Sequence, residues 1–105
     1  ADYFISIHRN SSPIPNQYTG IESLVYNRNS TAGNIAENIN RNLEAIGFAN
    51  QGINERKNLA VLRRTTMPAV LVEAGFINNE QDNVLFDERF DEIAQAIADG
   101  ILESI

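Results

Sequence analysis

The sequence lacks cysteine and tryptophan, and it has a single histidine among its 105 residues. Without cysteine there is neither a disulfide framework nor a thiolate zinc site, so any bound metal would depend on histidine and carboxylate side chains. Long apolar runs are missing too. None approaches the ~20 residues that a bilayer-spanning helix needs, and no charged-then-apolar leader opens the chain. We therefore expect no membrane span and no targeting signal in this segment.

Basic side chains are also few: 8 Lys and Arg stand against 14 Asp and Glu, for a net charge of -6. Nucleic-acid binding depends on cationic side chains that face phosphates, so this balance argues against a nucleic-acid partner. The hydrophobic fraction is 43%, with 6 Gly and 3 Pro, which is typical of a globular protein. A chain of this length has room for one hydrophobic core, and we expect one compact domain.

Hydrophobic periodicity predicts a layered α/β fold, in which a sheet of about four strands is flanked by amphipathic helices. The expected strands are residues 3–8, 20–26, 59–63 and 69–73; the expected helices are 32–46, 80–85 and 90–105. Residues 9–16 and 49–58 are polar and are expected to be connections. The stretch 20–26 alternates, which places Ile21, Ser23 and Val25 on one side of the strand.

His8 is the first candidate for a chemical role, because it is the only imidazole in the sequence. It is the last residue of the first expected strand, shares a face with Ser6 and precedes Arg9 and Asn10. The end of a strand is where α/β sheets bind ligands. A lone histidine in such a place is also common as a hydrogen-bonded structural residue.

Glu73 is the second candidate, because it ends the most apolar expected strand and is followed by Ala-Gly-Phe-Ile. A carboxylate in apolar surroundings loses hydration, which raises its pKa toward the range of a general base. The alternative is a carboxylate that faces solvent or pairs with Arg63 or Arg64. One histidine and one glutamate do not complete a zinc site, since catalytic zinc usually takes three protein ligands.

Four strings in this order resemble the zinc-dependent N-acetylmuramoyl-L-alanine amidases, bacterial and phage enzymes of cell-wall cleavage. They are ADYFISIHRN (1–10), GIESLVY (20–26), NLAVLRRTTMPAVLVEAGFINN (58–79) and IAQAIADGIL (93–102). The resemblance implies that His8 is a zinc ligand and that Glu73 is the catalytic carboxylate. It also implies that Asn10 and Arg63 border the substrate cleft.

The activity implied by the resemblance is hydrolysis of the amide bond between N-acetylmuramic acid and L-alanine in peptidoglycan. Zinc-activated water would attack, with Glu73 as general base. The family's other two ligands, a His and a Glu, belong to an upstream half that this sequence does not contain. We therefore expect residues 1–105 to be the C-terminal portion of a single catalytic domain, acting outside the cell or in the bacterial cell wall as an autolysin or endolysin.

Two alternatives to a complete catalytic role remain open. The chain can be a non-catalytic wall-binding or regulatory remnant that keeps the fold and the groove without the metal. Strands that normally pair with the upstream half would also be left as open edges. Such edges invite pairing with that half or with a second copy of the chain.

Overall fold

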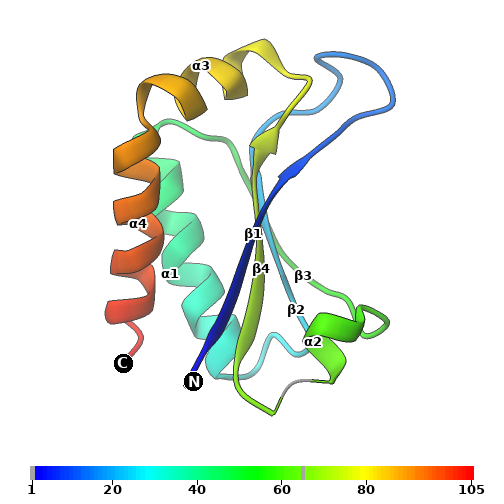
Figure 1. Cartoon of the computed structure of the whole chain (residues 1–105), viewed down its shortest axis with the longest axis vertical. Coiled ribbons are helices and arrows are strands. Elements are labelled where there is room, and N and C mark those ends of the chain that lie inside the picture. Colours follow the sequence, from blue (N-terminus) through cyan, green and yellow to red (C-terminus); the bar gives the residue numbers. More distant parts are fainter. Residues whose placement is uncertain (1, 65) are drawn as a thin grey trace.

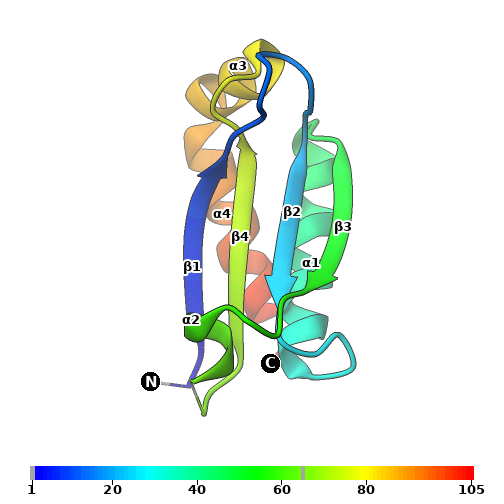
Figure 2. The ribbon, with the colours of Figure 1, turned by 90° about the vertical axis from the view of Figure 1, so that its right-hand side faces the viewer.

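The computed structural model describes residues 2–64 and 66–105, and its centre is a four-stranded sheet. The strands are β1 (Phe4–Asn10), β2 (Ile21–Val25), β3 (Asn50–Glu55) and β4 (Ala69–Phe76). Their order across the sheet is β1-β4-β2-β3 (Figure 2). β4 runs parallel to β1 and antiparallel to β2, whereas β2 and β3 are parallel.

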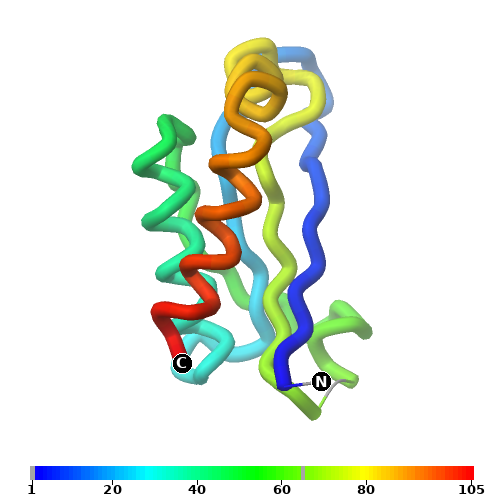
Figure 3. The backbone as a smooth tube through the Cα atoms, turned by 60° about the vertical axis from the view of Figure 1, so that its left-hand side comes forward, coloured from blue at the N-terminus to red at the C-terminus, as the bar shows by residue number. Residues whose placement is uncertain are grey.

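Two long helices, α1 (Thr31–Ile46) and α4 (Phe90–Leu102), lie against the same face of the sheet (Figures 1 and 3). The short helix α2 (Ala60–Arg63) lies on the other face, and α3 (Glu80–Glu88) lies beyond the end of β4 (Figure 1). We call the face opposite α1 and α4 the open face. The layered α/β fold with four strands is thus confirmed. Within the described residues, no helix has both the length and the apolar character needed to cross a membrane.

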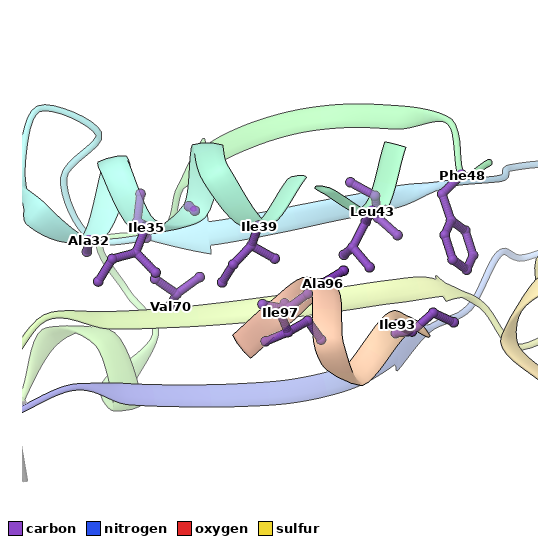
Figure 4. Close-up of a cluster of buried hydrophobic side chains, with 13 residues drawn as sticks. Ala32, Ile35, Ile39, Leu43, Phe48, Val70, Ile93, Ala96 and Ile97 are labelled. Atoms are coloured by element: carbon purple, nitrogen blue, oxygen red, sulfur yellow. The ribbon is translucent and has the colours of Figure 1, made fainter. Parts of the chain in front are cut away.

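The core forms between the sheet and the apolar stripe of α1. Ile35, Ile39 and Leu43 recur at three and four residues, and all three have no exposed surface (Figure 4). The sheet contributes Val70 from β4, and α4 contributes Ile97. Burial of such side chains contributes roughly 1.5–3 kcal/mol each, which makes this stripe the main reason that α1 is a helix. The Ser30 hydroxyl caps its first turn.

Residues 49–58 were expected to be a connection, but residues 50–55 form β3. The segment is polar because it is an edge strand, half of it exposed. The side chain of the buried Asn40 on α1 holds it in place: Nδ2 donates to the carbonyl of Gly52 at 2.8 Å and to Asn50 Oδ1 at 3.1 Å. Tertiary hydrogen bonds therefore determine this strand, which is why periodicity does not reveal it.

Residues 59–63 were expected to be a strand but contain helix α2. Five residues with four apolar side chains fit either a buried strand or one helical turn. In the structure, Leu62 is 4% exposed and packs with Leu24 and Leu71 on the open face. The remaining differences lie at element ends: β1, β4 and α3 extend further than expected, and α4 ends at Leu102.

A bulge in β4 interrupts its pairing with β1 near the end of the sheet. His8 is opposite Glu73 but Asn10 is opposite Phe76, so β4 has one extra residue here. Gly75 absorbs it with a φ of 82°. A Cβ at Gly75 would also lie 3.2 Å from Asp82 Cβ. The bulge therefore needs glycine, and it re-aims Phe76.

Candidate functional site

Three ionisable side chains form a row across the open face. Glu73 on the central strand β4 is opposite His8 on β1 and opposite Glu22 on β2. Residues paired directly across neighbouring strands project to the same face and lie about 5 Å apart at Cβ. The structure therefore brings His8 and Glu73 together on one face, as the sequence predicts, and adds Glu22 to them.

Neither candidate lies at a strand end, which corrects the expected positions. β1 continues to Asn10 and β4 continues to Phe76, so His8 and Glu73 lie inside their strands. The strands are longer because the polar residues after His8 still pair with β4. The row is consequently fixed by backbone ladders on both sides of Glu73 rather than by loops.

Glu73 is the most unusual group of the row. Its Oε2 is buried and has no hydrogen-bond partner in the part of the chain that the structure describes. Loss of hydration raises the pKa of Glu73; the positive charge of His8 opposes the rise, and the negative charge of Glu22 adds to it. A buried carboxylate oxygen without a hydrogen bond destabilises a fold, which makes Glu73 a candidate for a chemical role.

His8 is exposed, and its Nε2 lies 2.9 Å from Ser6 Oγ on the same strand face. Which of the two atoms donates depends on the tautomer of the imidazole. Ser6 thus orients the ring over the open face next to Glu73. A neutral imidazole in this position is chemically suited to bind a metal ion or to accept a proton.

The donor set of this chain does not complete a zinc site. Among residues 2–64 and 66–105, no group of three or more His, Cys, Asp or Glu side chains is arranged to hold a metal ion. The row supplies one imidazole and a carboxylate with a free oxygen, which fit part of such a site. Catalytic zinc usually needs three protein ligands, so further ligands would have to come from outside these residues.

The two residues expected to border the cleft lie at opposite ends of the sheet. Asn10 ends β1, and its Oδ1 accepts a hydrogen bond from the backbone of Ser11 at 2.8 Å, which fixes the turn after the strand. Arg63 on α2 is exposed and lines a cavity of about 400 Å³ that also borders Ala69, the first residue of β4. Ala69 and Glu73 are four positions apart on β4, so their Cα atoms are separated by roughly 13 Å. The structure therefore does not bring Arg63 to the row.

Glu22 and Asp82 are the residues that sequence reasoning missed. Alternation in residues 20–26 already placed Glu22 on the side opposite Ile21, but nothing in the sequence pairs that strand with β4. Asp82 is 1% exposed and accepts hydrogen bonds from the backbones of Gly20 and Phe76 at 2.9 and 2.8 Å. It thereby ties the start of β2 to the end of β4, which holds the row in register.

The family model of N-acetylmuramoyl-L-alanine amidase matches residues 1–103. The endolysin of Bacillus phage SPP1 is 31% identical, over 98% of this chain and 40% of its own length. The probable cell wall amidase LytH of Staphylococcus aureus is 29% identical, over 95% of this chain and 34% of its own length.

Solved structures agree. The catalytic domain of the CD27L endolysin, which targets Clostridia difficile, has a TM-score of 0.87 and 31% identity over 97% of this chain and 54% of its own. The catalytic domain of CwlV from Bacillus (Paenibacillus) polymyxa var. colistinus has a TM-score of 0.82 and 40% identity over 98% of this chain and 57% of its own. The chain thus spans less than half of the curated relatives and little more than half of these solved chains. By sequence and by fold, it belongs to the N-acetylmuramoyl-L-alanine amidase family, which is generally zinc-dependent.

Proposed function

We propose that this chain carries the general base and one metal ligand of a peptidoglycan amidase. The bond cleaved is the amide between N-acetylmuramic acid and L-alanine. The observation that carries the proposal is the placement of Glu73: its free, buried oxygen lies on the open face between His8 and Glu22. The family match over residues 1–103 supports the same chemistry.

In this proposal Glu73 moves the proton. Its pKa is raised mainly by lost hydration. The proton affinity of the carboxylate is therefore closer to that of the attacking water and the departing amine, the two groups with which it exchanges a proton. Glu73 Oε2 accepts a proton from the attacking water and returns it to the departing amine of L-alanine. A bound zinc ion supplies polarisation of the amide carbonyl and lowers the pKa of its water to about 7. His8 would hold that ion together with residues from outside this chain.

We further propose that residues 1–105 form the C-terminal portion of one catalytic domain. The chain covers 54% of the CD27L domain and 57% of the CwlV domain, which leaves room for the missing ligands in the rest of those folds. β1 is an edge strand of the sheet in the described part of the chain, so its outer side can pair with an upstream segment or a second copy. The site of action is the bacterial cell wall, as the names of the relatives suggest.

The test compares the 105-residue chain with the same chain fused behind the upstream half of a related catalytic domain. Bound zinc is measured by elemental analysis and activity by release of peptides from purified peptidoglycan. We expect zinc-dependent release from the fusion only. In the fusion, Glu73→Gln should keep zinc and lose most turnover, whereas His8→Ala should lose both. Release by the chain alone, or zinc loss in Glu73→Gln with zinc retained in His8→Ala, would contradict these assignments.

A second candidate function is wall binding without catalysis. It is favoured by the single imidazole and by the absence of a three-residue metal cluster in the described part of the chain. In that case the 105-residue chain sediments with insoluble peptidoglycan in the presence of a chelator, and the fusion releases no peptide. Sedimentation together with zinc-dependent release by the fusion would favour the amidase.

A further inference from the structure

A cavity of about 220 Å³ opens on the open face beside Glu22. It is lined by Tyr18 and Thr19 before β2, Glu22 on β2, Gln51 on β3 and Phe76 at the end of β4. The rings of Tyr18 and Phe76 lie 6.0 Å apart and form its apolar wall. Because Glu22 is directly opposite Glu73, the cavity begins on the side of Glu73 away from His8.

Two of the polar side chains that line the cavity make hydrogen bonds within the fold. Gln51 Nε2 donates to the carbonyl of Thr19 at 2.8 Å, and Thr19 Oγ1 donates to Asp82 Oδ1 at 2.7 Å. This leaves Gln51 Oε1 as an acceptor. The acceptors of the cavity are the carboxylate of Glu22 and Gln51 Oε1; its donors are the second hydrogen on Gln51 Nε2 and the phenol of Tyr18 at the exposed rim.

Glu22 is held in place for a ligand outside the sheet. Asn54 Nδ2 on β3 donates to Glu22 Oε2, which fixes the carboxylate and leaves Oε1 without a hydrogen bond to the described residues. The neighbouring carboxylate of Glu73 adds negative charge. A group that donates hydrogen bonds and carries positive charge would relieve the repulsion between the two carboxylates.

We propose that this cavity binds an ammonium group on the peptide part of the substrate, with Glu22 as its acceptor and the Tyr18 and Phe76 rings against the aliphatic stem. The assignment of this ammonium group to the substrate peptide rests on the proposed function. The existence of an ammonium-binding site in the cavity does not. An anionic group is disfavoured here, because it would face the carboxylate of Glu22 and the neighbouring carboxylate of Glu73.

The test uses the 105-residue chain in the presence of a chelator, and two probes that differ by one charge. One is a tripeptide that ends in lysine amide, and the other is the same peptide with its Nζ acetylated. Affinities are measured by calorimetry. We expect the ammonium probe to bind about threefold to tenfold tighter, as a partly exposed charge-assisted hydrogen bond supplies. The preference should shrink at high salt.

Glu22→Gln should remove the preference, and Glu44→Gln on the exposed surface of α1 is the matched control that should keep it. Tyr18→Lys places a competing cation at the exposed rim and should also remove the preference, even if Glu22→Gln is poorly folded. Equal binding of the two probes, or a preference unchanged in both variants, would overturn the inference. The assay measures no hydrolysis, so its failure leaves the amidase proposal intact, and failure of peptide release leaves this binding intact.

Discussion

The buried carboxylate of Asp82 offers the sharpest test of how the row is held. Its side chain is 1% exposed and accepts three hydrogen bonds: from Thr19 Oγ1 at 2.7 Å, from Gly20 N at 2.9 Å and from Phe76 N at 2.8 Å. Asp82→Ala leaves two backbone N–H groups without a partner. Each buried unpaired donor costs about 1–3 kcal/mol, so we expect a loss of about 2–6 kcal/mol.

A loss of this size is a large part of the 5–15 kcal/mol that stabilises a typical domain. Asp82→Asn is the matched variant. Its amide oxygen can accept from both backbone donors, while its NH₂ turns to Thr19 Oγ1, which accepts equally well. We expect Asp82→Asn to cost about 1 kcal/mol, mostly from weaker charge-assisted bonds. Urea unfolding followed by circular dichroism measures both. If alanine is tolerated as well as asparagine, the carboxylate does not organise this end of the sheet.

Three further predictions concern other parts of the chain. Glu73 has a pKa raised in the folded state, so its native form loses stability as pH rises above the ordinary value of 4.5; Glu73→Gln should therefore gain stability relative to the wild type at about pH 7 but not at about pH 4. Thermal unfolding at both pH values checks this, and a pH-independent difference would contradict it. Gly100→Ala places a Cβ 2.6 Å from Ile39 Cγ1 and 2.8 Å from Ile39 Cα, where α4 crosses α1. We expect overpacking to lower the free energy of unfolding by ~1–3 kcal/mol, offset by up to ~1 kcal/mol from the higher helix propensity of alanine, as measured by urea unfolding. A stabilised variant would mean that the two helices separate freely. Asn40→Ala should leave the carbonyl of Gly52 unpaired and speed amide exchange in β3 more than in β4, which hydrogen-exchange measurements would show.

Sequence reasoning succeeded where a segment carries its own signal. The apolar stripe within residues 32–46 predicts helix α1, and in the structure Ser30 caps this helix and Gly47 ends it, which are local features as well. The same holds for the cap of α3, where Asn79 Oδ1 accepts from the backbone of Asp82 at 2.9 Å. Such features depend on neighbours within four residues, so a single sequence contains them in full.

It failed where distant residues decide. β3 is a strand because Asn40, ten or more residues earlier, bonds its backbone, and α2 is a helix because Leu62 fits against Leu24 and Leu71. The site follows the same division. His8 and Glu73 are conspicuous in the sequence, but the pairing of Glu22 with Glu73 depends on strand order, which no local pattern specifies.

The strand order also governs when the sheet can form. β1 is the first of the four strands in sequence, but its partner β4 begins at Ala69, so β1 emerges from the ribosome well before the strand with which it pairs. Contacts so distant along the chain slow folding, since a long loop must close before they form. A nascent chain stalled before residue 69 therefore leaves β1 without β4, and chaperone capture of such stalled chains should fall once β4 has been translated.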